Sequence, residues 1–131
     1  MKALKGFKQF EQKFCEMLYE HGFWAHNLAQ NASGQPADVI AVKNEKAYLI
    51  DCKVCSRGRF PFSRIEDNQH TAMETWQESG NGNGWFALLC SDHIFMLDYD
   101  TLKRLSKTQS SISYPEICFY GCALESWVVW A

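Results

Sequence analysis

The stretch ADVIAVKNEKAYLIDCKV (residues 37–54) places three charged residues inside two short apolar runs. The runs are PADVIAV (36–42) and YLIDCKV (48–54), and each has the length of a β-strand. Asp38, Asp51 and Lys53 stand where this pattern calls for apolar side chains. A buried carboxylate or ammonium without a partner costs several kcal/mol. The three charges are therefore expected to have a role that offsets this cost.

The two runs predict a β-hairpin, with strands over residues 37–43 and 46–55 and a turn at Asn44–Glu45. Successive side chains of a strand point to opposite faces of the sheet. Asp51 and Lys53 are therefore expected on one face, while Cys52 points to the other. An acid and a lysine on the same face can act at one site.

A helix is predicted on each side of the hairpin. The first spans residues 7–21, and its apolar stripe consists of Phe7, Phe10, Phe14, Met17 and Leu18. Glu11 falls on the apolar side of this helix. The second runs from the capping-box pattern Ser63–Glu66 to about residue 78 and carries Gln69 on its apolar stripe.

The remaining segments are expected to be short strands, turns and loops. Strands are predicted at 23–29, 85–90 and 93–99, and loops at 31–36, 56–62 and 106–113, with a flexible turn at 80–84. Asp100 is expected to cap a helical turn through Leu105. The tail, residues 116–131, has strand-like composition with a break at Gly121.

Length and composition favour one globular domain over residues 1–131. The chain is 47% hydrophobic and 15% aromatic, which argues against disorder. No apolar run approaches the roughly 18–20 residues of a membrane span. The opening MKALKGFKQFEQKF is too charged for a signal peptide. A cytoplasmic protein is therefore expected, with no membrane partner and with its six cysteines reduced.

The charge distribution is more informative than the net charge of −2. Nucleic-acid-binding proteins usually carry a basic excess, which this chain lacks. However, Lys53, Arg57, Arg59 and Arg64 fall within twelve residues. A local basic patch directly after the charged strand suits a polyanionic substrate such as DNA. The alternative is a solvated loop.

Glu11, Asp38, Asp51 and Lys53 together indicate metal-assisted chemistry. Carboxylate oxygens suit Mg²⁺ or Mn²⁺, which bind through a few carboxylates and keep waters for substrate phosphates. Such a metal activates a water and stabilises charge on a phosphodiester. A nearby ammonium can orient that water or neutralise the developing charge. The alternative is that Asp51 and Lys53 form only a structural salt bridge.

A family resemblance appears at these residues. Gln35-Pro36-Ala37-Asp38 with Asp51-Cys52-Lys53 resembles the PD-(D/E)XK nuclease signature. FEQKFCEMLYEHGF (10–23) followed by NASGQPADVIAV (31–42) resembles the opening of archaeal-type Holliday-junction resolvases. GRFPFSRIEDNQHTAMETW (58–76), then WFALLC (85–90) and IFMLDYDTL (94–102), resembles the later half of the RecU-type resolvases of bacteria.

The resemblance implies an α/β (α+β), restriction-endonuclease-like fold in which helices flank a mixed central sheet. It implies a homodimeric, Mg²⁺-dependent endonuclease of DNA recombination and repair that acts on branched DNA, with Mn²⁺ able to substitute. Asp38 and Asp51 would be metal ligands and Glu11 an additional or water-bridged ligand. Lys53 would orient the water, and Gln69 would support the site. Asp51 stands where glutamate is commoner, which shortens the reach to a metal.

Three other functions remain open from the sequence. One is a related nuclease acting on flap, nicked or modified DNA. Another is a DNA-binding module that keeps the fold without cutting. The third is a zinc-stabilised interaction domain built on Cys52 and Cys55 with Cys118 and Cys122. Strand alternation argues against zinc, because Cys52 and Cys55 should point to opposite faces.

Overall fold

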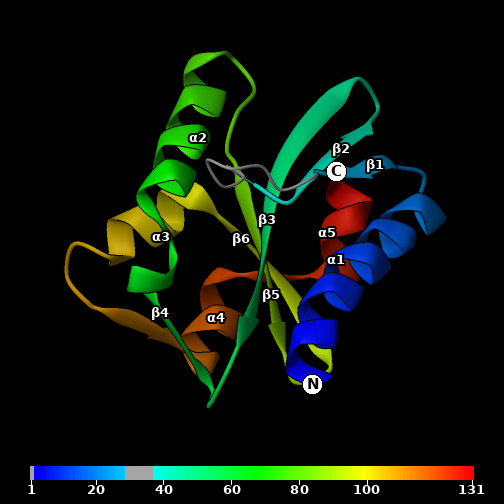
Figure 1. Cartoon of the computed structure of the whole chain (residues 1–131). Helices are drawn as coiled ribbons and strands as arrows, with labels where there is room; N and C mark the ends of the chain where they lie inside the picture. The colour runs from blue at the N-terminus through cyan, green and yellow to red at the C-terminus, as the bar shows by residue number, and fades with distance from the viewer. Residues whose placement is uncertain (1, 29–36) are drawn as a thin grey trace.

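A mixed β-sheet forms the centre of the structure (Figure 1). The structure, a computed structural model, describes residues 2–28 and 37–131, and the side chains of residues 9–28 and 37–131. Six strands of this part lie in the order β1-β2-β3-β5-β6-β8. They are β1 (Trp24–Asn27), β2 (Val39–Lys43), β3 (Lys46–Cys55), β5 (Trp85–Cys90), β6 (His93–Asp98) and β8 (Cys122–Ala123). β3 and β5 are parallel and the other neighbours antiparallel, which confirms the predicted mixed sheet.

Helices cover both faces of the sheet, as predicted (Figure 1). α1 (Lys2–Glu20) and α5 (Leu124–Trp130) lie on one face. α2 (Asp67–Glu78), α3 (Tyr99–Leu105) and α4 (Tyr114–Tyr120) lie on the other, beside a small sheet of β4 (Arg59–Pro61) and β7 (Ser111–Ser113). No helix of the described residues is long and apolar enough to cross a membrane.

The alternation of β3 separates two hydrophobic cores. Ile50 and Cys52 belong to the core under α1 and α5, together with Phe14, Leu18 and Trp127. Leu49 and Cys55 belong to the core under α2, α3 and α4, which contains Met73, Phe86, Leu102 and Ile117. Burying one such large side chain contributes about 1.5–3 kcal/mol. Packing from both sides therefore fixes the register of β3 and the face on which each charge lies.

The hairpin turns at Asn44–Glu45, as predicted. Both residues have positive φ, 52° and 66°. This is the conformation of the type I′ turns that match the twist of paired strands. Lys43 pairs with Lys46 across the turn, and Val39 pairs with Ile50. Asp38 is thereby placed one residue before β2, with its N–H donating to the Ile50 carbonyl at 3.1 Å.

The first helix follows the predicted stripe. α1 begins at Lys2, before the predicted start at residue 7, and Phe10, Phe14 and Leu18 on it are buried. The side chain of Phe7 lies outside the described residues, as do the predicted loop at 31–36 and the motif residues Gln35 and Pro36.

The predicted start of the second helix at Ser63 is wrong. Residues Phe62–Arg64 form a 3-10 turn, and α2 begins at Asp67. The capping box is formed by Glu66 and Gln69, whose amide oxygen accepts the Glu66 N–H at 3.0 Å. Phe62 and Ile65 are both buried, so the chain turns into the core before the helix can start.

The prediction for the tail is also wrong, because residues 114–131 form two helices joined by the short strand β8. A capping box of Ser113 and Glu116 begins α4, with Glu116 N–H donating to Ser113 Oγ at 3.4 Å. The aromatic and β-branched residues of the tail resemble those of a strand because they cover the sheet.

Two predicted loops contain strands, and one predicted cap is misplaced. Residues 56–62 include β4 and residues 106–113 include β7, each only three residues long. α3 is capped by Asp98 rather than Asp100, because Asp98 Oδ2 accepts the Thr101 N–H at 3.0 Å. Elements of this length carry too little periodicity to be recognised.

Gly84 lies directly against Met73 of α2. A Cβ atom at this position would stand 1.9 Å from Met73 Sδ. Gly80 and Gly82 have positive φ and no neighbouring atoms in the way. The segment predicted as a flexible turn therefore contains one glycine required by packing, which lets α2 lie close to the start of β5.

Candidate active site

Asp51, Lys53 and Gln69 form a connected group between β3 and α2. Asp51 is fully buried, and its Oδ1 accepts a hydrogen bond from Gln69 Nε2 at 3.2 Å. Lys53 Nζ lies 3.3 Å from Asp51 Oδ2 and donates to Gln69 Oε1 at 3.1 Å. Each of the three side chains therefore contacts the other two, as strand alternation and the helix stripe predicted.

The Gln69 side chain also forms part of the cap at the start of its own helix, α2. Its Oε1 accepts the Glu66 N–H as well as the Lys53 ammonium. Glu66 was predicted as the glutamate of a capping box with Ser63, whereas in the structure it is the N-cap residue of α2 and Gln69 occupies the third helical position. The cap fixes the rotamer of Gln69 and so fixes the amide that faces Asp51.

Asp38 approaches the same site from β2. It is 7% exposed, and its Oδ2 accepts the Cys52 N–H at 2.7 Å. The main chain of β3 therefore orients the Asp38 carboxylate. The negative charge of Asp38 acts on Asp51, so two carboxylates from neighbouring strands share one buried region.

The pKa of Asp51 is raised well above its usual range. Burial is the largest cause, the charge of Asp38 adds to it, and the Lys53 ammonium opposes it. Apart from the Lys53 ammonium at 3.3 Å, Asp51 Oδ2 has no hydrogen-bond donor among the described residues. A buried carboxylate with an oxygen so placed, beside a second carboxylate, fits a divalent cation.

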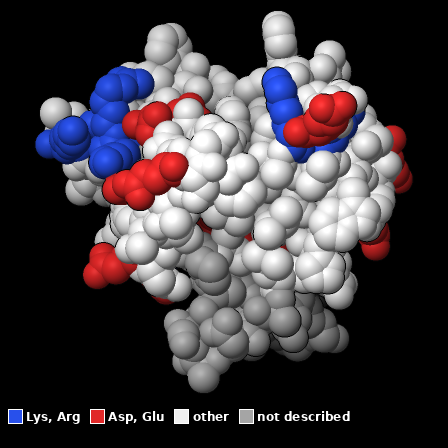
Figure 2. All heavy atoms as spheres, turned by 90° about the horizontal axis from the view of Figure 1, so that it is seen from above, with Lys and Arg blue, Asp and Glu red and all other residues white. Residues whose placement is uncertain are grey.

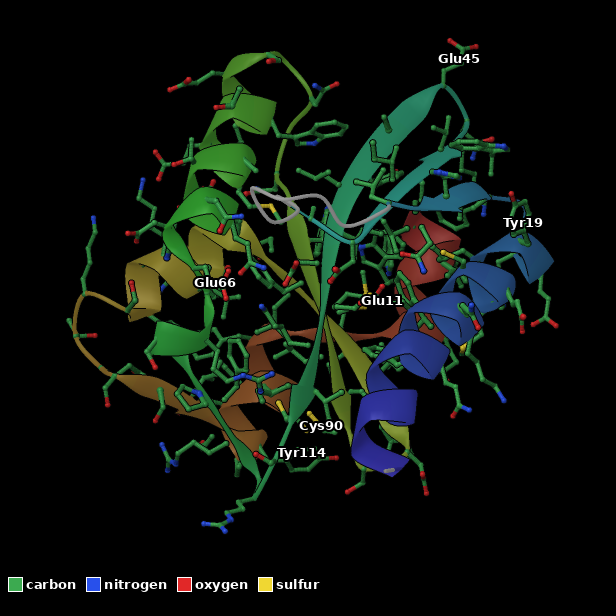
Figure 3. All side chains as sticks on the ribbon, viewed as in Figure 1. Glu11, Tyr19, Glu45, Glu66, Cys90 and Tyr114 are labelled. Carbon is green, nitrogen blue, oxygen red and sulfur yellow. The ribbon has the colours of Figure 1, made fainter. Side chains whose placement is uncertain are left out.

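Glu11 lies on the side of α1 that faces the sheet (Figure 3). Burial raises the pKa of the Cys52 thiol, and the charges of Asp38, Asp51 and Glu11 raise it further. Glu11 is thus within electrostatic range of the site. However, no three His, Cys, Asp or Glu side chains of the described residues stand close enough together to hold a metal. The structure brings Asp38 and Asp51 together without completing a triad with Glu11.

The three arginines of the predicted DNA-binding patch differ in their contacts. Arg64 donates to the Val54 carbonyl and lies over the Phe60 ring, 5.4 Å from its centroid. Arg59 donates to Ser111 Oγ at 2.7 Å. Arg57 is exposed in the turn after β3, with φ 57°. Figure 2 views the molecule from the top of Figure 1, whereas the turn after β3 lies at the bottom, and on this upper face basic side chains gather at two separate places.

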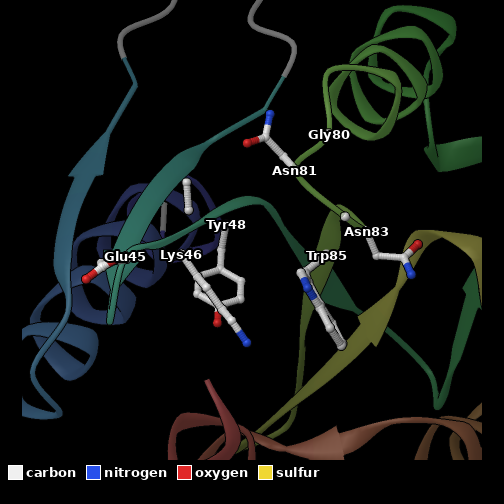
Figure 4. A pocket seen from close by; sticks show the side chains of 9 residues that line it. Glu45, Lys46, Tyr48, Gly80, Asn81, Asn83 and Trp85 are labelled. Atoms are coloured by element: carbon white, nitrogen blue, oxygen red, sulfur yellow. The ribbon is translucent and has the colours of Figure 1, made fainter.

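A larger cavity lies away from this group. It has a volume of about 510 Å³ and lies between the tip of the β2–β3 hairpin and the segment after α2 (Figure 4). Its lining includes Lys46, Tyr48, Asn81 and Trp85, and none of the predicted site residues. This cavity and the carboxylate pair are therefore separate features.

Gln69→Ala should reduce the nuclease activity that the sequence resemblance implies by about 10- to 100-fold, because supporting residues around metal sites typically have effects of this size. It should also lower the free energy of unfolding by about 1 kcal/mol through loss of the cap. Cleavage rates and thermal unfolding measure the two effects. Gln77→Ala is the matched control, since Gln77 lies on the same helix and contacts only Asn83 and Asp100 through its amide nitrogen. Equal loss of cleavage in both variants would contradict a role for Gln69 at the site.

Comparison with known proteins gives the family. A family model described as archaeal Holliday junction resolvase (Hjc) matches residues 1–126. Solved structures that match include Hjc of Archaeoglobus fulgidus, described as a Holliday junction resolvase from an archaeal hyperthermophile, with 16% sequence identity and a TM-score of 0.72. The match covers 92% of this chain and 98% of that chain, and at this identity it shows the fold. No match was found among curated proteins. Because the family model spans nearly the whole sequence, the chain belongs to the archaeal Holliday junction resolvase family.

Proposed function

We propose that this protein is a Mg²⁺-dependent endonuclease that cuts branched DNA as a homodimer, with Asp38, Asp51, Lys53 and Gln69 at its active site. Membership of the resolvase family makes it a nuclease acting on DNA, and use of a divalent metal is general in that family. The observation that supports the assignment of the site is the buried Asp51 carboxylate, which lies beside the Lys53 ammonium and a second carboxylate, Asp38.

Asp38 and Asp51 would hold the cation, with Asp38 kept in place by the Cys52 N–H. When bound, the cation supplies an activated water and stabilises charge on the phosphodiester. Lys53 orients that water or neutralises the developing charge on the phosphate, since its ammonium is fixed by Asp51 and Gln69. Gln69 positions both charged partners and does not itself need to touch DNA.

Glu11 is proposed as a water-bridged ligand. Mg²⁺ keeps several waters and is usually bound by one or two carboxylates directly. A third carboxylate that lies near the site without closing a triad suits contact through such a water.

The function is tested with a panel of four-way, flap, nicked and linear DNA, each with Mg²⁺, Mn²⁺ or a chelator. We expect metal-dependent cutting of the four-way junction, and none by Asp38→Ala. Preferential cutting of flap or nicked DNA would support the related-nuclease alternative. Binding without cutting of any substrate would support the non-cleaving module.

Neither remaining alternative is favoured by the structure. A decayed, non-cleaving site would be expected to lose a charged group, whereas both acids and the lysine are present. Cys52 and Cys55 point into different hydrophobic cores, so they do not form a chelating pair. Metal analysis that found zinc bound to these cysteines would contradict this conclusion.

Arg57 is the arginine best placed to contact a phosphate, because it has no hydrogen bond or ion pair to any described residue. Arg57→Gln should weaken binding across DNA sequences and reduce the slope of log K against log salt by about 1. Arg64→Gln should instead lower the unfolding temperature, since Arg64 contacts Val54 and Phe60. Binding titrations at several salt concentrations measure the slope. An unchanged slope for Arg57→Gln would indicate that the turn is a solvated loop that does not contact DNA phosphates.

The exposed end of α5 is the surface proposed for the homodimer. Val129 and Trp130 are 79% and 82% exposed, and exposed apolar side chains of this size mark interaction surfaces. Trp130→Ser should therefore convert a dimer to a monomer in sedimentation measurements. Phe119→Ser tests the competing surface, because Phe119 is equally exposed, at 80%, and lies on α4; dissociation by this variant alone would place the interface on α4. If the Trp130→Ser protein stays dimeric, the dimer interface does not include the end of α5.

A further inference from the structure

Cys55 and Cys90 stand side by side at the ends of two parallel strands. Cys55 is the last residue of β3 and Cys90 the last of β5, and the two are partners in the strand register. Both side chains lie in the core under α2, α3 and α4. Their side chains are therefore immediate neighbours on one face of the sheet. Each thiol also shifts the pKa of the other, which agrees with this proximity.

The backbone spacing permits a bond between these sulfur atoms. Neighbouring strands lie about 4.7–4.9 Å apart, within the roughly 4.4–6.8 Å between Cα atoms that a disulfide spans. The hairpin turn after Cys55 and the turn after Cys90 leave both strand ends at an edge of the core. A bond formed there would be reducible if the geometry is strained.

A cavity gives small molecules access to both thiols. It has a volume of about 300 Å³ and is lined by Cys55, Cys90 and Tyr114, together with Arg57, Gly58 and Ser91. Figure 3 shows Cys90 and Tyr114 close together at this end of the sheet. A water molecule occupies about 30 Å³, so a hydroperoxide fits. The thiols are 9% and 5% exposed, which shields them from larger reagents.

We propose that Cys55 and Cys90 are an oxidisable dithiol that a hydroperoxide converts to a disulfide joining β3 to β5. The Cys55 thiolate attacks one peroxide oxygen, the O–O bond breaks, and a sulfenic acid and water form. The Cys90 sulfur then attacks the Cys55 sulfur, the S–O bond breaks, and a second water leaves with the Cys90 proton. Two thiols lose two electrons in total, and hydrogen peroxide is reduced to two waters.

The electrostatics assign the order of attack. The hydrogen bond from Cys90 and the charge of Arg64 lower the pKa of Cys55 against the effect of burial. The pKa of Cys90 is raised by the same hydrogen bond and by burial. Cys55 is therefore the first nucleophile and Cys90 the resolving thiol.

The disulfide would close a loop of the chain that contains α2 and its site residue Gln69. Cys55 follows Lys53 by two residues, and residues 56–89 between the cysteines include α2 with Gln69. Oxidation would thus restrain the strand carrying Asp51 and the helix that contacts it. This inference stands on the thiol geometry and does not depend on the nuclease assignment.

The test is peptide mapping of the full-length folded protein after treatment with hydrogen peroxide. Free thiols are alkylated, and the protein is digested with trypsin without reduction. Cleavage after Lys53, Arg57, Arg64 and Lys103 places Cys55 in peptide 54–57 and Cys90 in peptide 65–103. Cys52 falls in peptide 47–53. We expect one linked pair, 54–57 with 65–103, two hydrogen atoms lighter than the separate peptides and separated again by dithiothreitol.

Two cysteine variants and oxidation of the unfolded protein test whether the disulfide is specific to Cys55 and Cys90. Cys118→Ser should leave the linked pair unchanged, although Cys118 is an exposed thiol that contacts Tyr114 beside the cavity. Cys90→Ser should abolish it and leave Cys55 as a sulfenic acid that a dimedone probe captures. The same oxidation in guanidinium should scatter the links among all cysteines. Wild-type protein in which both thiols stay alkylatable, or pair with other cysteines, would overturn the proposal even if a variant fails to fold.

Discussion

Asp51→Asn is expected to abolish metal-dependent DNA cleavage while making the metal-free protein more stable. Loss of a ligand that contributes several kcal/mol to the transition state should lower the cleavage rate by about 10³-fold or more. The free energy of unfolding should rise, because the variant removes a carboxylate whose charged form is disfavoured by burial and by Asp38. A gain of about 1 kcal/mol would raise the unfolding temperature by roughly 3–6 °C.

The two effects are measured as cleavage of a four-way junction with Mg²⁺ and as thermal unfolding in a chelator. Asp92→Asn is the control, since Asp92 is exposed in the turn between β5 and β6. Addition of Mg²⁺ should stabilise the wild type and not Asp51→Asn. An active Asp51→Asn protein, or one stabilised equally by Mg²⁺, would show that Asp51 is no ligand.

The same carboxyl predicts a pH dependence. Its pKa is raised in the folded protein, so folding favours the proton, and this stability is fully present below the ordinary aspartate range. It is lost as the pH rises through the raised value. Wild type and Asp51→Asn should therefore have similar stability in acid and diverge as the pH rises. Thermal unfolding in a chelator over this pH range measures the divergence.

Lys53→Ala is expected to reduce cleavage by about 10²- to 10³-fold, the usual effect of removing one group that stabilises developing charge. DNA binding should change little, since the ammonium contacts Asp51 and Gln69 among the described side chains. The free energy of unfolding should fall at pH values where Asp51 is ionised, because the buried carboxylate loses its cation. Single-turnover cleavage at saturating protein isolates the chemical step from binding.

Lys46→Ala is the matched control, because Lys46 lies on the same strand but is exposed beside the hairpin turn. Loss of activity in both variants would indicate a general effect of charge on DNA binding. Full activity of Lys53→Ala would show that the ion pair between Lys53 and Asp51 is only a structural salt bridge.

The β2–β3 hairpin could be predicted from the sequence because strand alternation and turn residues are patterns within a short stretch of chain. Alternation along residues 46–55 assigned Asp51 and Lys53 to one face, and Asn44–Glu45 marked the turn. The helix stripe predicted that Gln69 faces the sheet, the resemblance implied its place at the site, and it is buried against Asp51. A residue that violates a periodic pattern is visible without any knowledge of the rest of the chain.

The remaining features depend on contacts that a local pattern does not contain. The orientation of Asp38 is set by the main-chain N–H of Cys52, which any residue would supply. The helices of the tail were missed because Trp127 and Val128 bury against the other face of the sheet, so their composition follows burial and not helix propensity. The distance of Glu11 from the carboxylate pair depends on how α1 packs, which no spacing in the sequence determines.

The absence of a side chain at Gly84 has a consequence for the chemistry one helical turn away on α2. Met73 occupies the space that a Cβ at position 84 would need, and Gln69 lies one turn before Met73 on the same stripe. A larger residue at 84 would displace the Met73 side chain, which is fully buried, so the core beside α2 would have to repack. Activity after substitution at position 84 would therefore report how far this core can repack without disturbing the amide that faces Asp51.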